Sequence, residues 1–478
     1  MLDQLLAKKT DFSEYDSGDG PCLKRTLGPW GLTALGIGAV IGGGIFVITG
    51  TAAAEHAGPA IILSFVIAAI CCSFTALCYA EFATLIPMSG SSYSYAYATL
   101  GELVAWFIGW NMVLEYGVSA SAVAVSWTGY FTSLLEHFGI VLPAVLTNAP
   151  LAFQDNHIVS TGAWFNLPAV AIVLALTWLC YVGIRESSGA NLAMVILKVG
   201  LIVIVIVAGW HYVNPDLWHP FVPENQGGDK YGWSGVLRAA AMVFFAYIGF
   251  EATSTAAQEA KNPQRDLPIG TIVSLTICTI LYIGMAAVLT GLLPFGQLGT
   301  TEPVVTAVRA HPELAWLRVV VEVGALIGLS SVVLVMVIAQ PRIFMIMGRD
   351  GLLPPVFAKI HPRYCTPHIN TVITGIGIAA LAAVFPLDVL GDLVSMGTLI
   401  AFCAVCAGVW ILRRTQPDAP RTFRVPWAPV TCTLGIASCL MLLSTMSWYN
   451  WTLLVIWTVI GMAIYAGYGY RNSKLRKR

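Results

Sequence analysis

Three ionisable residues lie inside otherwise apolar stretches of the sequence, and their side chains are the ones that could do chemistry: Lys198, Glu115 and Glu251. A charge held away from water is costly, so such residues need a partner or a function. A desolvated lysine has its charged form disfavoured, which would let Lys198 load and release a proton. Glu115 could bind an ammonium group or share a proton. The structural alternatives are a permanently charged Lys198, a Glu115 paired with another helix, and a Glu251 that only caps exposed backbone.

Two breaks that contain glycine lie in the same kind of stretch. Gly42, Gly43 and Gly44 follow one another in the first apolar segment, and Gly249 interrupts a later one. Glycine is a poor helix former, so we expect the backbone to unwind at both places. Irregular backbone at membrane depth survives only where it lines a cavity or is buried in protein, which makes the breaks a candidate binding site. The alternative is a close packing face of small residues.

The two breaks would offer opposite polar groups to a zwitterion. A half-helix that starts after Gly44 has free amide donors and the positive end of its dipole, which suit a carboxylate. Half-helices that end before each break leave carbonyls unpaired, and these suit an ammonium group. The candidate binding residues at the breaks are Ile41, Gly42, Gly43, Gly44, Ile45, Ala246 and Ile248.

Composition places the chain in a membrane. Hydrophobic residues make up 57% of the sequence, charged residues 10%, and the mean hydropathy is +0.76. That leaves too little polar surface for a soluble protein of 478 residues. The net charge is zero, so the balance of charge implies no acidic or basic partner such as a nucleic acid. The 11 cysteines show no metal-ligand spacing, and we expect no disulfide framework, zinc site or cofactor.

About twenty apolar residues are needed per crossing, and on this criterion the sequence predicts twelve spans. They cover 30–54, 60–86, 100–132, 166–184, 190–212, 234–258, 269–293, 317–347, 370–386, 391–412, 428–446 and 450–470. Lys198 then lies about 12 to 13 Å inside the fifth span, at ~1.5 Å per residue. A lysine stem does not comfortably span that depth, so snorkelling to the membrane surface does not account for this residue.

The positive charges are distributed unevenly between the predicted loops. One side carries 20 Lys and Arg residues and the other carries four, with Lys198 left inside a span. Because positive loops stay in the cytoplasm, both termini are predicted to be cytoplasmic, including the tails 1–29 and 471–478.

Other polar features have simpler interpretations. Tyr93, Tyr95 and Tyr97 are expected to form an aromatic stretch of the cytoplasmic loop before the third span. Arg413-Arg414 is expected to anchor the chain near anionic lipid. Arg349-Asp350-Gly351 is expected to fix a loop turn after the eighth span.

Four motifs carry a family resemblance, and they occur in order on the expected segments: 36–46, 245–251, 259–270 and 349–354. They resemble the amino acid-polyamine-organocation (APC) transporters, and more closely the bacterial relatives of the cationic amino acid transporters. The resemblance implies an all-α polytopic membrane protein with a five-plus-five inverted repeat and broken helices 1 and 6. The first repeat would cover 30–212, the second 234–412, and two extra helices 428–470. It further implies symport of an L-amino acid with protons by alternating access, in the bacterial inner (plasma) membrane.

The resemblance also implies roles for single residues. Phe245 matches the aromatic residue that closes over the substrate, and Glu251 aligns with an acid implicated in the response to substrate or proton. Lys198 resembles the lysine that takes the place of a sodium ion between helices 1 and 8, where it would bond carbonyls of both helices. Met336 matches a position that lines the side-chain pocket, and its bulk would favour small side chains. The substrate is therefore expected to be a small neutral or a cationic amino acid.

Competing functions remain open at this point. The runner-up is an exchanger that swaps amino acids or polyamines without net proton flow, and Lys198 argues against it. An amino acid sensor is a different class that uses the same binding residues. A membrane enzyme would need a nucleophile with a base or a metal cluster, and the sequence has no His-x-x-x-x-Asp or His-Glu-x-x-His motif. Some members of the family recruit a single-span helper subunit.

Overall fold

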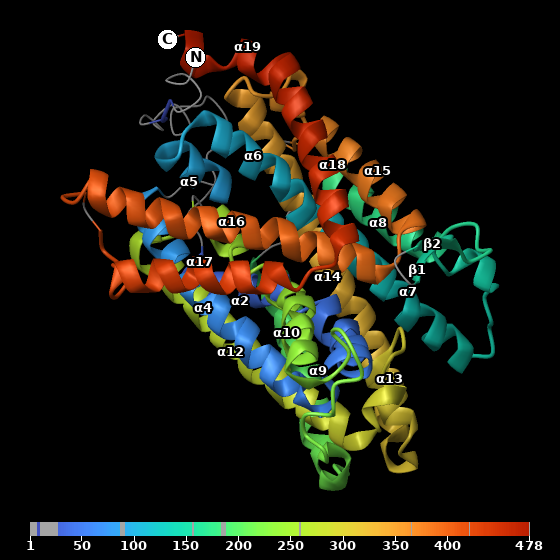
Figure 1. The fold of residues 1–478 in the computed structure, drawn as a ribbon. Coiled ribbons are helices and arrows are strands. Elements are labelled where there is room, and N and C mark those ends of the chain that lie inside the picture. The colour runs from blue at the N-terminus through green and yellow to red at the C-terminus, as the bar shows by residue number, and fades with distance from the viewer. Residues whose placement is uncertain are drawn as a thin grey trace.

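The chain forms a bundle of helices, seen in a computed structural model that describes residues 7–9, 27–86, 91–154, 157–182, 188–257, 260–364, 366–419 and 421–477 (Figure 1). Ala7 accepts a backbone hydrogen bond from Glu102, and the backbone N–H of Lys474 donates to the carbonyl of Asp350. The Lys9 ammonium contacts the Asp350 carboxylate at 2.6 Å. The two ends of the described chain therefore meet at one end of the bundle.

The helices and strands follow one another along the chain in this order. The first half contains α2 (Pro29–Val40), η2 (Gly44–Ile48), α3 (Thr49–Ala52), η3 (Ala53–Ala57), η4 (Gly58–Ala60), α4 (Ile61–Leu85), α5 (Ser91–Thr99), α6 (Glu102–Val113), η5 (Leu114–Val118), α7 (Ser119–His137), η6 (Ala144–Leu146), β1 (Leu151–Gln154), β2 (His157–Ser160), α8 (Leu167–Val182), α9 (Ser188–Trp210) and η7 (Pro215–Trp218). The second half contains α10 (Gly232–Val243), η8 (Phe244–Tyr247), α11 (Ala252–Thr255), α12 (Pro263–Leu292), η10 (Phe295–Gln297), α13 (Pro303–Arg309), η11 (Pro312–Leu314), α14 (Ala315–Arg349), η12 (Pro355–Ala358), α15 (His368–Val384), α16 (Leu387–Thr415), α17 (Ala428–Ser444), α18 (Trp448–Ile464), η13 (Tyr465–Gly469), α19 (Tyr470–Asn472) and α20 (Lys474–Lys477).

Every one of the twelve predicted spans contains a helix. Among the described residues, seven helical segments are long and apolar enough to cross a membrane: Gly44–Leu85, Leu192–Trp210, Gly232–Thr255, Pro263–Leu292, Pro312–Arg349, Leu387–Thr415 and Trp448–Asn472. Four apolar helices are shorter: Pro29–Val40, Leu167–Val182, His368–Val384 and Ala428–Ser444. The helical membrane class is thus confirmed, while twelve crossings and the repeat stay predictions.

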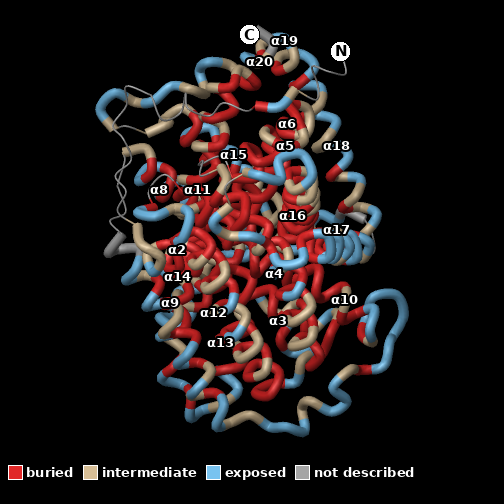
Figure 2. The backbone as a smooth tube through the Cα atoms, turned by 90° about the vertical axis from the view of Figure 1, so that its left-hand side faces the viewer, coloured by how far each residue is buried: buried red, intermediate tan, exposed pale blue. Residues whose placement is uncertain are grey.

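Burial separates an interior from a surface that suits lipid. Buried residues fill the middle of the bundle, and exposed residues are prominent on α17 and in the outer loops (Figure 2). The outer faces of α9 and α18 expose large apolar side chains, such as Ile196, Val207 and Val459. The antiparallel hairpin β1–β2 pairs Leu151 with Ser160 and belongs to the connection between α7 and α8.

The tyrosine-rich segment differs from its prediction. Residues 91–99 form helix α5, in which Tyr93, Tyr95 and Tyr97 are each 1% exposed. Tyr93 and Tyr97 each donate a hydrogen bond to a carboxylate, Tyr93 to Asp350 at 2.7 Å and Tyr97 to Glu102 at 3.0 Å. The prediction of a loop was wrong because these partners lie on α6 and directly after α14, where local sequence does not reveal them.

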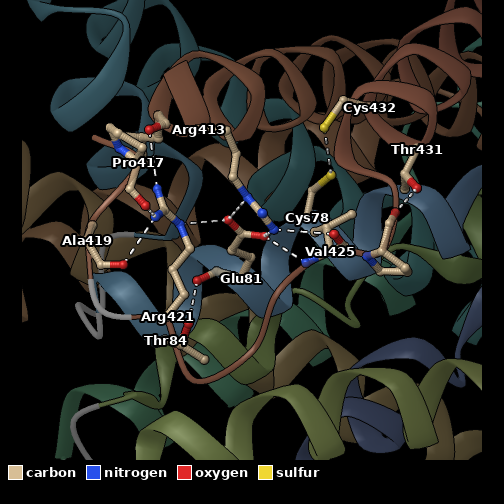
Figure 3. A network of polar contacts seen from close by, with 12 residues as sticks. Cys78, Glu81, Thr84, Arg413, Pro417, Ala419, Arg421, Val425, Thr431 and Cys432 are labelled. Atoms are coloured by element: carbon tan, nitrogen blue, oxygen red, sulfur yellow. Dashed lines mark hydrogen bonds and ion pairs between the residues drawn. The ribbon is translucent and has the colours of Figure 1, made fainter. Parts of the chain in front are cut away.

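Arg413 also has a more specific role than that of a lipid anchor. Its guanidinium binds both carboxylate oxygens of Glu81 on α4, at 2.8 and 2.6 Å (Figure 3). Arg421 donates to the same carboxylate at 3.0 Å, and the backbone N–H of Val425 donates at 2.8 Å. Glu81 is 1% exposed, so these donors replace the water that the carboxylate has lost. The contact ties α4 to the end of α16 and to the connection that leads into α17.

The cysteines form no disulfide in the described part of the chain, where most of them are buried. No group of His, Cys, Asp and Glu side chains that could hold a metal ion occurs in that same part. Some residues that the predictions above count lie outside the described residues: Cys22 and Cys365 among the cysteines, Lys24, Arg25 and Arg185 among the positive charges, and Glu259 in the motif 259–270.

Candidate functional site

The first break lies where the glycine run predicts it. Helix α2 ends at Val40, the backbone of Ile41 is extended with a ψ of 99°, and the chain resumes a helical course at Gly44. Ile41, the three glycines and Ile45 are all buried. The residues after the break form the π-helical turn η2, and Thr49, the first residue of α3, donates its hydroxyl hydrogen to the carbonyl of Gly44 at 3.1 Å.

The second break follows η8. Ile248 is extended with a ψ of 131°, and Gly249 has a φ of +121°, a conformation that side chains rarely adopt. A Cβ on Gly249 would lie 2.8 Å from the carbonyl carbon of Ala39, so the residue must be small as well as flexible. The glycine therefore allows the second broken chain to approach the first one closely.

The two breaks touch each other. A Cβ on Gly44 would lie 2.3 Å from both Cα and Cβ of Ala246, far inside a normal contact distance. A Cβ on Gly43 would lie 2.8 Å from the hydroxyl of Ser126 on α7 and 3.8 Å from the ring of Phe245. The structure thus brings together the residues that the sequence places at the two breaks, although they are about two hundred positions apart.

Tyr282 on α12 joins the two breaks, and the sequence analysis did not identify it. Its hydroxyl lies 2.9 Å from the carbonyl oxygen of Val40 and 2.8 Å from that of Ala246, with one hydrogen to donate. Both carbonyls lie at the ends of half-helices, where the break removes the N–H donor of the next turn. The Tyr282 hydroxyl supplies a donor in its place. Tyr130 acts similarly beyond the first break, where its hydroxyl donates to the carbonyl of Phe46 at 2.6 Å. In the sequence, the only signal for these roles is a tyrosine inside an apolar segment, and such tyrosines are common.

Lys198 reaches the first break from α9. Its ammonium donates to the carbonyl oxygens of Gly38 at 2.8 Å and Ile41 at 3.1 Å, and the residue is fully buried. Gly328 of α14 lies against the lysine stem, since a Cβ there would be 3.5 Å from the lysine Cγ. The predicted bonds to helix 1 carbonyls are therefore present, and α14, the eighth predicted span, packs beside them.

Glu115 and Glu251 lie together. Glu115 is in the π-helical turn η5, Glu251 follows the second break, and both are fully buried. Their carboxyl groups come within hydrogen-bonding reach of each other. Glu251 also accepts a hydrogen bond from the backbone N–H of Gly249 at 3.0 Å. One oxygen of Glu251 therefore caps exposed backbone at the break. The same carboxyl group also lies close to Glu115.

Phe245 and Met336 complete the predicted set. Phe245 is the second residue of η8 and is 4% exposed, and Met336 on α14 is 1% exposed. Both are enclosed in the bundle core together with Ile45. All three side chains therefore belong to the buried apolar core, and the Phe245 ring lies against the glycine run.

Comparison with known proteins shows the family of the chain. The sequence model of the amino acid permease family matches residues 27–468. The chain belongs to the amino acid permease family.

Three relatives of this permease illustrate the range of the family. A branched-chain amino acid permease of Bacillus subtilis is 46% identical over 95% of both chains. A methylthioribose transporter of the same organism is 45% identical, again over 95% of both. The vacuolar cationic amino acid transporter 4 of Arabidopsis thaliana is 38% identical over 86% of this chain and 67% of that protein. These names are those of transporters rather than enzymes, which agrees with an integral membrane protein that has apolar helices.

Proposed function

We propose that this permease is a secondary active transporter that takes up L-amino acids by proton symport. The observation that carries the proposal is the buried Lys198 ammonium, which bonds carbonyls of Gly38 and Ile41 beside the break. The backbone conformation of the first break would therefore depend on whether Lys198 carries its proton. Protonation would then bias the equilibrium between inward-open and outward-open states, because it changes the stability of one state more than the other.

The substrate would bind between the two breaks. The amides of Gly42, Gly43 and Gly44 would receive the carboxylate, and carbonyls at Ile41, Ala246 and Ile248 would receive the ammonium group. Gly44 and Ala246 are in contact, so binding there requires the breaks to move apart or the bonds of Tyr282 to be replaced. Opening of this contact would be the local event of alternating access.

Side-chain selection would fall to Phe245 and Met336, and Glu115 and Glu251 would add negative charge. The relatives named above include permeases for branched-chain amino acids and transporters for cationic ones. We propose small or branched neutral L-amino acids as the first substrates to test, with cationic ones next. A bulky thioether at position 336 favours the neutral class because it takes up room that a long side chain would need.

The membrane arrangement belongs to the same proposal. Twelve crossings in two inverted five-helix repeats, followed by two further helices, would place both termini in the cytoplasm. The bacterial inner membrane would be the location, with or without a single-span helper subunit. Lys9 and Lys474 both contact Asp350, which supports termini on one side.

The test is uptake by proteoliposomes that contain the purified chain. Labelled alanine, leucine, isoleucine, arginine, lysine and methylthioribose would each be offered under a proton gradient, a sodium gradient, or with counter-substrate alone. Accumulation driven by the proton gradient is the expected result. Uptake only against counter-substrate would establish the exchanger instead, and binding without any uptake would establish a sensor.

A further inference from the structure

A seam of cysteine side chains joins α4 to α16 and α17, and the proposed function uses none of them. Cys71 and Cys78 lie about two helical turns apart on α4, and Cys432 and Cys439 lie equally far apart on α17. The Sγ atoms of Cys71 and Cys439 are 3.6 Å apart, and those of Cys78 and Cys432 are 3.9 Å apart. Figure 3 shows the second pair, with its two sulfur atoms turned toward each other. The two helices thus hold two pairs of facing thiols.

Helix α16 adds a further thiol beside each pair. Cys403 lies within hydrogen-bonding reach of Cys439, and Cys406 lies within reach of Cys78. A Cβ on Gly435 of α17 would come 2.8 Å from the Cys406 sulfur, so a larger residue at this position would push α17 away from the seam. Cys403 is partly exposed, whereas the other thiols of the seam are buried. One thiol is therefore within reach of small molecules from outside the bundle.

The facing thiols are close enough to become disulfides. An S–S bond is about 2.05 Å long, so the sulfur atoms would have to approach by about 1.6 Å in the first pair and about 1.9 Å in the second. Two side chains share each movement, and each can rotate about its Cα–Cβ bond. Cysteines that serve only as small apolar core residues have no need to face one another twice along the same two helices.

The surroundings of the seam decide which oxidant can reach it. The opposite face of α17 exposes Val430, Leu434, Leu440 and Met441, which suit contact with lipid. A charged reagent is costly to transfer into such apolar surroundings, whereas a neutral lipid-soluble one dissolves in them. Quinones are neutral, lipid-soluble oxidants that accept two electrons, the number that formation of one disulfide releases.

Helix α4 also contacts the breaks of the candidate site. Tyr247 of η8 donates to the carbonyl of Phe65 at 3.1 Å, and the Phe65 ring lies 5.5 Å from the ring of Tyr282, whose hydroxyl contacts both breaks. Tyr79 packs its ring against Phe250 at 5.8 Å. Helix α17 packs against α16 as well as α4. A covalent bond between α4 and α17 would therefore restrain the movement of the breaks relative to α16.

We propose that the pairs Cys71–Cys439 and Cys78–Cys432 are a site of reversible oxidation, at which a quinone links α4 to α17 and arrests transport. For each link, two S–H bonds break and one S–S bond forms, while the quinone accepts two electrons and two protons and becomes a hydroquinone. A dithiol reverses the step by thiol–disulfide exchange. The arrest rests on the proposed transport function, whereas formation of the bond does not.

The test oxidises the purified full chain in proteoliposomes whose lipid contains duroquinone. Linked peptides would be mapped by mass spectrometry after digestion without reduction, and uptake of the amino acid that the substrate panel identifies would be measured on the same sample. We expect the links Cys71–Cys439 or Cys78–Cys432, a loss of uptake in proportion to the linked fraction, and recovery after dithiothreitol. Ferricyanide is charged and stays out of lipid, so it should leave both pairs reduced; equal linking by ferricyanide would refute the lipid route.

The double variant Cys71→Ala with Cys78→Ala removes one partner of each pair and should keep its uptake in the presence of duroquinone. Cys432→Ala with Cys439→Ala removes the other partners and gives the same test if the first variant does not fold. The matched control is Cys72→Ala, because Cys72 is the neighbour of Cys71 on α4 and is equally buried. This control should still form the links and lose uptake.

A peptide map without these links would overturn the proposal, as would links that leave uptake unchanged or equal inhibition of the double variants. If the unmodified protein takes up no compound of the panel, the proposed function fails and the arrest fails with it. The peptide map does not depend on transport, so it still decides whether the thiols pair.

Discussion

An alanine at position 44 should separate the two breaks by a measurable amount. Its Cβ would lie 2.3 Å from Cα and Cβ of Ala246, and 2.9 Å from the Ala246 nitrogen. Carbon atoms pack at about 3.5 to 4.0 Å, so the two chains must move apart by about 1 Å or more. The atoms that clash belong to backbone and to a short side chain, so a change of rotamer cannot relieve the contact. Overpacking of this kind costs ~1–3 kcal/mol.

The cost falls on the states in which the breaks are in contact. A change of 1–3 kcal/mol corresponds to about 5- to 150-fold in an equilibrium constant. We expect Gly44→Ala to gain up to that factor in affinity for its amino acid, because the contact that must open for the ligand is already strained in the ligand-free protein. The assay is equilibrium binding in detergent, with thermal unfolding of the ligand-free protein as a check on folding.

A matched control lies on α16. Gly391 also faces the first broken helix, yet a Cβ there would be 3.5 Å from Cδ1 of Ile48, an ordinary contact. Gly391→Ala should therefore bind as the unmodified protein does, and it should gain slightly in helix propensity. Equal affinity in Gly44→Ala and Gly391→Ala would refute the argument that the contact between the breaks must open for the substrate.

Three further outcomes can be measured on the same preparations. Lys198→Ala should abolish accumulation driven by a pH gradient, with ~1–3 kcal/mol lost in thermal unfolding for each carbonyl left without its donor; undiminished accumulation would contradict the coupling role. Met336→Ala should let amino acids with longer side chains compete better in uptake, while the cavity costs ~2–5 kcal/mol of stability, and an unchanged competition order would remove Met336 from the selectivity site. Glu81→Gln should lower the unfolding free energy by about 3 kcal/mol, because the buried Arg421 loses its counter-charge. Arg414→Ala should leave the unfolding temperature unchanged, since Arg414 is exposed beside Trp410, and an equal loss in both variants would contradict the role of Glu81.

The breaks and the buried lysine could be predicted because their signals are local. A glycine run inside an apolar segment marks a place where a helix cannot easily continue, and the structure interrupts the backbone at Ile41 and at Gly249. The depth of Lys198 follows from counting residues along one span. Hydropathy alone likewise assigns the chain to the membrane.

Contacts between distant segments could not be predicted in the same way. The Glu115–Glu251 contact joins η5 to the second break, and a single sequence has no means to pair these residues. The burial of Tyr93 and Tyr97 depends on Asp350 and Glu102, which belong to other elements. The sequence analysis expected a loop, whereas the structure places the hydroxyls of Tyr93 and Tyr97 against buried carboxylates.

The two buried titratable features act on different halves of the candidate site. Lys198 bonds carbonyls beside the first break, while Glu251 bonds the amide of Gly249 in the second. On the proposed mechanism, loss of the proton from Lys198 would weaken its bonds at the first break, whereas an ionised Glu251 remains a good acceptor for the amide of Gly249. A change at one of these residues then has no direct effect on the other break. Tyr282 removes that independence, because its single hydroxyl hydrogen serves carbonyls from both breaks and can satisfy only one at a time. If the Val40 carbonyl moves away, the Tyr282 hydroxyl can therefore donate to the Ala246 carbonyl instead. Tyr282→Phe should accordingly leave Lys198 in place and still uncouple the two breaks, which would appear as substrate uptake that no longer depends on the pH gradient.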